Sequence, residues 1–436
     1  MSYQGHRTSS RMFSRNSNQG VDTMNATRFW ANFRHLQTIG KRKDGAYRVA
    51  WTEEDQMARQ TLLDLLHQEG LHGYQDGAGN IWGIWSPVDN APYLVMGSHL
   101  DSVPRGGDFD GVFGVAAALE SLLAMRDKAP EPLCLNGALV AFADEEGVGF
   151  NSGLFGSRAV CGFLTREIFN NFHDDSGTRY LAETAPRFGI TWESVSHLDV
   201  IPIAVYLELH VEQGPNLDRS GIPVGVVNVI TGRSQGFARF VGQQNHAGTT
   251  PMPLREDALL YAANAVVRLN QIVGRAGAVG TVGQLKAMPG SPNVIADSAV
   301  VSFDVRSPSD TVRNIAVRDW VNSWHGGTLF AYHEEAAVPL YPAIQDVIAR
   351  AASKEGLKAM TVPSWAVHDA MIMAKKVPTG LIFIPSVQGI SHAAEEFSHP
   401  QHCEEGVRVL EDTARSLCAS DLRRQEPKSE DEGKGS

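Results

Sequence analysis

Three histidines and two acids in this chain border short apolar segments, where side chains from distant parts of a fold can meet. They are His99, Asp110, Glu146, His210 and His392. Imidazole nitrogens and carboxylate oxygens together form a ligand set that suits Zn²⁺, Mn²⁺ or Co²⁺. Because no cysteine accompanies them, the pattern disfavours a structural zinc site. We therefore predict a metal centre that performs chemistry.

Glu145 and Glu146 are adjacent in the segment ADEEG. Neighbouring carboxylates repel each other, so such a pair usually faces solvent. A bound cation changes this, because one carboxylate can ligate it while the other holds a water molecule and accepts its proton. The residues alone do not say which glutamate takes which role.

Each candidate taken singly has a plainer interpretation. His99 and Asp101 lie two positions apart, which on a strand places them on the same side, so that one can ligate and the other can orient it. A lone histidine, however, is more often a satisfied polar residue. Asp110 follows GGDF and precedes an apolar helix, where aspartate is a common N-cap.

The pentapeptide GRSQG places Ser234 in a GxSxG pattern, which in serine hydrolases forms a turn between a strand and a helix. Here the following residues, FARFVG, are typical of another strand. We interpret Ser234 as a linker residue and keep a metal-free serine hydrolase as the alternative class.

Four apolar segments become polar at their carboxyl ends, as buried parallel strands do. They are residues 93–101, 135–146, 203–214 and 380–392. Helices are predicted from Thr52 to Leu66 and over 111–125. Ligands of open α/β sheets lie beyond the carboxyl ends of strands, so the class is α/β with the metal residues at one sheet edge.

Residues 231–341 follow a different pattern, β-α-β-β-α-β, which is that of a split βαβ domain. We predict a main domain over 22–230 and 342–420, this inserted domain, and disordered tails at 1–21 and 421–436. Arg306 closes an apolar strand of the insertion, where its guanidinium could grip a carboxylate. A surface ion pair is the simpler interpretation.

The composition limits the function. A net charge of −11 argues against nucleic acid binding, and no apolar run reaches the ~20 residues that span a bilayer. The basic N-terminus weakly suggests a transit peptide, although a disordered tail fits better. Four cysteines without a CxxC pair indicate free thiols in a reducing, cytoplasmic setting: Cys134, Cys161, Cys403 and Cys418.

Several segments together resemble one family of enzymes. They are GSHLDSVPRGGDFDG, FADEEG, LELHVEQGP, HAGTTPM, GSPNVI, FDVRS and HDAMIMA…GISHAAEEFS. In colinear order over residues 25–418, they resemble the N-carbamoyl-L-amino-acid hydrolases, β-ureidopropionases and allantoate amidohydrolases of the di-metal aminoacylase/carboxypeptidase superfamily. The resemblance implies a di-metal catalytic domain interrupted by a smaller dimerisation (lid) domain, and a homodimer.

The resemblance also implies a role for each metal residue. Asp110 would bridge two divalent ions, most simply Zn²⁺, with Mn²⁺, Co²⁺ or Ni²⁺ as alternatives. One ion would be completed by His99 and His210, and the other by Glu146 and His392. Glu145 would be the general base, and Asp101 would orient His99.

The substrate residues implied by the resemblance are Gln213, Asn293 and Arg306, with Arg306 on the substrate carboxylate. His246 would reach the other subunit's site and stabilise the oxyanion. The sequence departs from the family at SWAVHDA, where Trp365 and Val367 add bulk near the predicted pocket. Arg105 likewise stands where a small or uncharged residue is common.

The expected reaction is hydrolysis of an N-carbamoyl-L-amino acid to the amino acid, CO₂ and ammonia. Allantoate or another ureido acid is the alternative substrate. A non-catalytic metal-binding scaffold is a further class, but it gives no reason for an acid beside the ligand Glu146.

Overall fold

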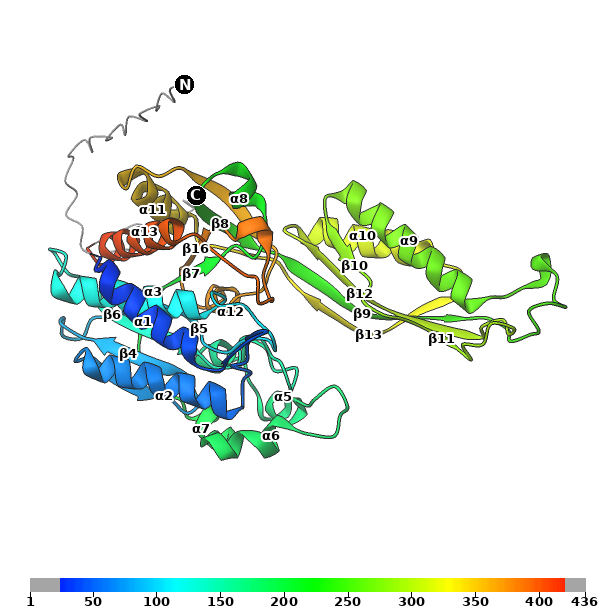
Figure 1. Ribbon diagram of the computed structural model, residues 1–436, viewed down its shortest axis with the longest axis horizontal. Coiled ribbons are helices and arrows are strands. Elements are labelled where there is room, and N and C mark those ends of the chain that lie inside the picture. Colours follow the sequence, from blue (N-terminus) through cyan, green and yellow to red (C-terminus); the bar gives the residue numbers. More distant parts are fainter. Residues whose placement is uncertain (1–23, 420–436) are drawn as a thin grey trace, which may run out of the picture.

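The computed structural model describes residues 24–419, and the two predicted tails, 1–21 and 421–436, lie outside them. Figure 1 shows a main domain of helices around a sheet and an elongated inserted domain beside it. In the described range, no helix has the length and apolar character needed to cross a membrane.

The centre of the main domain is four adjacent parallel strands, which are the four apolar segments of the sequence. In sheet order they are β16 (Thr379–Ile384), β7 (Ile203–Val211), β5 (Tyr93–His99) and β6 (Asn136–Phe142). Nearly all their residues are buried because helices or loops cover both faces. Their carboxyl ends therefore meet at one edge, as predicted.

Five further strands extend this sheet on both sides and make it mixed. They are β3 (His72–Gln75), β4 (Ile81–Trp85), β8 (Val224–Ile230), β14 (Val338–Pro339) and β15 (Ala359–Ser364). β8 runs antiparallel to β16 and parallel to β15. The α/β class with a mixed sheet is thereby confirmed.

Most long helices of the main domain share one hydrophobic core with the sheet. They are α1 (Ala26–Thr38), α2 (Glu53–Gln68), α3 (Val112–Asp127), α11 (Pro342–Lys354) and α13 (Pro400–Cys418). α3 is apolar on every side because it lies between the sheet and α1 and α13. The Thr52 side chain caps α2, as its sequence predicted.

Shorter elements complete the main domain. They are β1 (Lys41–Arg42), β2 (Gly45–Ala46), α4 (Phe155–Val160), α5 (Arg166–Asn171), α6 (Leu181–Thr184), α7 (Trp192–Ser196), α8 (Asn216–Ser220) and α12 (Asp369–Met373), with 3-10 turns η1 (Ala185–Phe188) and η3 (Val387–Gly389). α12 packs against α4, β7 and β16 on the second face of the sheet.

The inserted domain (residues 232–335) has an antiparallel sheet with two helices packed on it. Its elements are β9 (Gly232–Val241), η2 (Met252–Leu254), α9 (Ala258–Ala276), β10 (Val279–Thr281), β11 (Leu285–Met288), β12 (Ser298–Ser307), α10 (Asp310–Asn322) and β13 (Gly327–Glu335). The second strand of the predicted pattern is divided into β10 and β11. Between them the N–H of Gln284 donates to the Ser302 hydroxyl and not to a backbone carbonyl.

The inserted domain leaves and rejoins the main sheet at one place. β14 pairs antiparallel with β8, Val338 lying opposite Ile230. β14 therefore belongs to the main sheet, although the predicted boundary at 341 placed it in the insertion. The linker interpretation of Ser234 is wrong, because this residue is buried within β9. No helix follows it, so GRSQG does not form a nucleophile turn.

Candidate metal centre and active site

The carboxyl ends of β5 and β7 bring two histidines to one oxygen of Asp110. Nε2 of His99 lies 3.5 Å and Nε2 of His210 lies 3.1 Å from Asp110 Oδ1. All three side chains are buried. Asp110 reaches them from the loop before α3, so the three groups converge from three separate segments.

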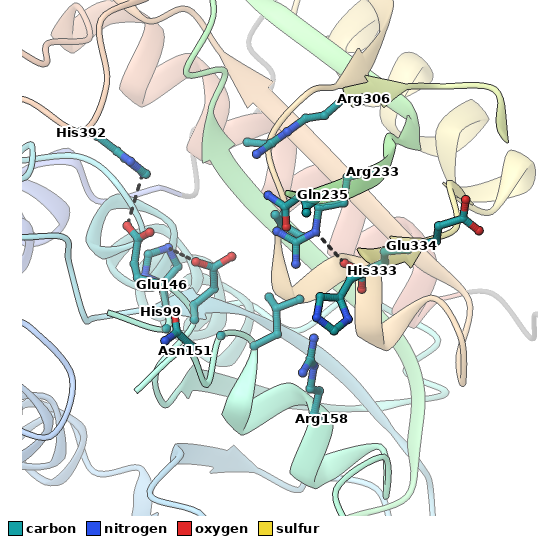
Figure 2. A pocket seen from close by; sticks show the side chains of 18 of the residues that line it. His99, Glu146, Asn151, Arg158, Arg233, Gln235, Arg306, His333, Glu334 and His392 are labelled. Carbon is teal, nitrogen blue, oxygen red and sulfur yellow. Dashed lines mark hydrogen bonds and ion pairs between the residues drawn. The ribbon is translucent and has the colours of Figure 1, made fainter. Parts of the chain in front are cut away.

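The other oxygen of Asp110 faces a second group. Nε2 of His392 lies 3.1 Å from Asp110 Oδ2 and 3.4 Å from Glu146 Oε1. Figure 2 shows His392 and Glu146 directed toward each other from opposite segments. In each set of three residues the potential ligand atoms lie within 4.8 Å of one another. The structure thus brings the five predicted residues together as two sets that share Asp110.

Asp110 is not a helix N-cap. The cap of α3 is Gly111, whose φ is +64° and which makes no side-chain cap bond. A side chain at Gly111 would collide with the His99 ring, since an added Cβ would lie 2.4 Å from its Cε1. The glycine lets Asp110 approach the histidines, so the motif serves the site rather than the helix end.

The charges of the site fit divalent cations. Burial and the neighbouring Asp110 raise the pKa of Glu146 to about 8, and its Oε1 is buried without a hydrogen-bond partner. Burying acids this closely is unfavourable unless a cation compensates them. The nitrogen and oxygen donors match the ligand preferences of zinc-like ions.

Backbone carbonyls fix the orientation of two of the histidines. Nδ1 of His99 lies 3.0 Å from the Asp101 carbonyl, and Nδ1 of His210 lies 2.8 Å from that of Val211. Carbonyls only accept, so each Nδ1 carries the proton and each Nε2 lone pair faces Asp110. Both rings are therefore arranged as metal ligands.

Asp101 has a second task that the sequence did not indicate. Its carboxylate accepts the backbone N–H of Glu145 at 3.2 Å and that of Glu146 at 3.1 Å. One acid thus holds the loop that carries both glutamates while its carbonyl orients His99. These two hydrogen bonds hold the backbone of Glu145 and Glu146 in place.

Glu145 lies beside the first set of ligands and lines the adjoining cavity. Its Oε2 is 3.9 Å from Nε2 of His99. Burial, followed by the charges of Glu146 and Asp369, raises the pKa of Glu145 well above that of a free glutamate. It belongs to neither set of ligands, so its carboxylate is available for proton transfer.

A cavity of about 1270 Å³ adjoins the metal residues and extends to the inserted domain. Gln213 lines it and donates from Nε2 to Asp110 Oδ2 at 2.9 Å. The wall also contains Val367, as expected, whereas the Trp365 side chain does not contribute. Arg105 lies outside the cavity, highly exposed and 3.4 Å from Asp44. Neither Trp365 nor Arg105 therefore shapes the pocket by its bulk.

Arg306 lines the same cavity and is already partly paired. Its Nε and Nη2 each donate to the Asp304 carboxylate at 3.0 Å, and its Nη1 donates to the Trp365 carbonyl at 2.8 Å. Arg306 therefore forms the ion pair that the simpler interpretation expected, with Asp304. The pair lies in the cavity wall. Two of the five guanidinium N–H groups remain for a ligand.

His246 and Asn293 lie together, away from this cavity. His246 forms a β-bridge with Val294, and Ala247 N donates to the Asn293 carbonyl. The segment between β9 and α9 is at the end of the inserted domain farthest from the main domain (Figure 1). Neither residue lines the cavity of its own chain.

Glu396 is a site residue that sequence reasoning missed. Its Oε1 accepts hydrogen bonds from the backbone N–H groups of Phe109 and Asp110, both at 2.9 Å. Its Oε2 accepts a hydrogen bond from the Ser391 hydroxyl at 2.6 Å. It therefore joins the loop of Asp110 to the loop of His392. The only indication in the sequence was an acid four residues after the predicted ligand His392.

Comparisons with known proteins agree with this geometry. Residues 95–416 match the model of peptidase family M20/M25/M40. The chain is 34% identical to an N-carbamoyl-L-amino acid amidohydrolase of Geobacillus stearothermophilus, covering 89% of this chain and 98% of that protein. It is 30% identical to the allantoate amidohydrolase of Escherichia coli K12, covering 84% and 90%.

Solved structures show the same similarity. A hydantoinase/carbamoylase-family amidase of Burkholderia multivorans superposes with a TM-score of 0.80 at 31% identity, covering 91% of this chain and 98% of that one. The match includes both the main and the inserted domain, so the similarity extends to the whole architecture.

Proposed function

Because the chain belongs to peptidase family M20/M25/M40, in the carbamoylase and allantoate amidohydrolase subfamily, we propose that it hydrolyses N-carbamoyl-L-amino acids. The products are the free amino acid, CO₂ and ammonia. The observation that carries the proposal is the pair of ligand sets joined by Asp110, with Glu145 beside them. This arrangement supports hydrolysis of a linear C–N bond.

His99, Asp110 and His210 would hold one divalent ion, and Asp110, Glu146 and His392 the other. When bound, such ions activate water and polarise the scissile carbonyl. Glu145 accepts the proton of the attacking water and then delivers it to the leaving nitrogen, which makes it both general base and general acid. Asp101 keeps Glu145 in place by accepting a hydrogen bond from its backbone N–H.

Recognition of the substrate involves the inserted domain. The two remaining N–H groups of Arg306 can bind the substrate carboxylate in the cavity, and Gln213 lies close enough to the metal residues to contact the ureido group. His246 accepts the N–H of Gly248 at its Nδ1, so its Nε2 carries a proton. That N–H is a suitable donor to an oxyanion.

We further propose a homodimer, because His246 and Asn293 lie outside their own cavity. Large apolar side chains are exposed on the same domain, including Met252 at 69% and Leu254 at 73%. Such side chains are expected to be covered in an assembly. Sedimentation at micromolar concentration should therefore give twice the mass of one chain.

The test is ammonia release from N-carbamoyl-L-amino acids, β-ureidopropionate, allantoate and N-acyl amino acids, each with and without a chelator. We expect turnover of at least one N-carbamoyl-L-amino acid, abolished by the chelator and restored by a divalent metal. Fast turnover of allantoate alone would favour the alternative substrate, to which the relative in E. coli points. Chelator-resistant turnover would overturn the proposal.

A further inference from the structure

One guanidinium in the cavity wall makes no hydrogen bond or ion pair with the described residues. Arg158 lies on α4 and lines the cavity, but within residues 24–419 no hydrogen bond or ion pair of its side chain is found. Figure 2 shows it directed into the cavity toward His333. Burial lowers the pKa of Arg158, and the charge of Glu335 offsets part of this effect. An unpaired charge in such a place is costly unless a ligand compensates it.

Two more positive side chains line the same cavity. Arg233 of β9 and Lys375 share a single carboxylate, that of Glu335, with N–O distances of 3.0 and 3.9 Å. Arg158, Arg233 and Lys375 line the cavity, where Glu335 is paired with two of them. Asp175 also lines the cavity and accepts a hydrogen bond from Asn151. Glu334 does not compensate this excess, because it is exposed and points away from the cavity in Figure 2.

Arg158 is held at a definite position relative to the reacting groups. The N–H of Leu154 donates to the Glu145 carbonyl at 2.9 Å, and the N–H of Arg158 donates to the Leu154 carbonyl at 3.0 Å. These two bonds connect the first turn of α4, which carries Arg158, to the loop that carries Glu145.

The cavity also has more room than a small neutral substrate needs. Sites for small ligands typically measure about 300–1000 Å³, whereas this one measures about 1270 Å³. In the function proposed above, the ureido group binds at the metal centre and the α-carboxylate binds to Arg306. Arg158 and Arg233 belong to neither contact.

We propose that Arg158 and Arg233 form a second anion subsite, which selects N-carbamoyl amino acids with an acidic side chain. The substrate class is thus a ureido dicarboxylate: one carboxylate on Arg306 and the other between Arg158 and Arg233. This inference rests on the proposed function of the same site. Guanidinium groups suit it because they bind carboxylates through paired, charge-assisted hydrogen bonds.

The test compares N-carbamoyl-L-glutamate with N-carbamoyl-L-glutamine, which have nearly the same shape and differ in charge. We expect the wild type to prefer the glutamate derivative in kcat/KM. Arg158→Gln should lower kcat/KM for that substrate by about 10- to 100-fold, the range for losing a charged hydrogen bond. The glutamine derivative should change less than about threefold, and Arg158→Lys should restore part of the loss.

Arg166→Gln is the matched control, because this arginine is exposed on the nearby α5. It should leave both substrates unaffected, and equal melting temperatures should exclude misfolding. Equal losses on both substrates would overturn the inference and make Arg158 a contact that holds the two domains. If the wild type shows no preference for the glutamate derivative, the inference also fails. If no ureido substrate is hydrolysed at all, the proposed function itself has failed.

Discussion

Replacing Glu145 by glutamine is the sharpest test of the site. The carboxamide has almost the same size, and the contact of the Glu145 backbone N–H with Asp101 does not depend on the side chain. Only 8% of the side chain is exposed, so solvent has little access to take over its role. What is lost is the ability to accept a proton and return it.

The size of the effect follows from this role. General acid–base catalysis contributes about 10²- to 10⁴-fold, which at 1.36 kcal/mol per tenfold is about 3–5 kcal/mol of transition-state stabilisation. We therefore expect kcat of Glu145→Gln to fall at least ~10²-fold. The metal content should be unchanged, because Glu145 belongs to neither ligand set.

Glu146→Gln is the matched comparison at the neighbouring position. Its carboxylate belongs to the second ligand set, so this variant should lose metal as well as turnover. The assay is steady-state ammonia release combined with metal analysis of the purified variants. Near-wild-type turnover of Glu145→Gln would refute the assignment, as would a loss of activity in that variant that merely follows a loss of metal.

Other parts of the structure make separate predictions. Arg306→Ala should raise KM for carboxylate substrates by about 10- to 100-fold, the cost of a charged hydrogen bond, and an unchanged KM in steady-state assays would exclude it as the carboxylate contact. Ser234→Ala should keep its turnover and its sensitivity to chelator, because Ser234 is buried in β9 and accepts a hydrogen bond from Tyr332; an inactive but folded, metal-loaded variant would revive the serine hydrolase alternative. A thiol reagent at pH 8 should label native Cys134 and spare the other three cysteines, because the thiolate is the reactive form and burial raises the pKa of Cys161 and Cys418 to about 12 and that of Cys403 further. Mass spectrometry of labelled peptides would test this, and rapid labelling of a second site in folded protein would contradict it.

The sheet was predictable because of where its strands lie. Strands buried on both faces consist of uninterrupted apolar residues, so β5 and β6 could be recognised without an alignment. Their acids and histidines come directly after the apolar run, which places them at the sheet edge. His392 was harder, because it stands eight residues beyond the end of β16 and only the loop held by Glu396 returns it to Asp110.

Other features depend on long-range packing that spacing does not encode. The pairing of Arg306 with Asp304 follows from two positions on one strand and could have been expected. Its contact with the Trp365 carbonyl requires knowing how two domains meet. Arg158 gave no signal at all, since a single arginine in FGSRAV looks like any surface residue until the opposite wall is known.

The pairing of β8 with β14 has a consequence for how such an enzyme can change over time. Because Ile230 and Val338 are cross-strand neighbours, the inserted domain branches from the main sheet at a single point. If Arg233 and Arg306 contact the substrate as proposed, mutations on β9 and β12 would change these contacts without moving the strands that carry His99 and His210. Substrate contacts on β9 and β12 can then be selected separately from the metal residues, whereas Arg158 on α4 belongs to the main domain.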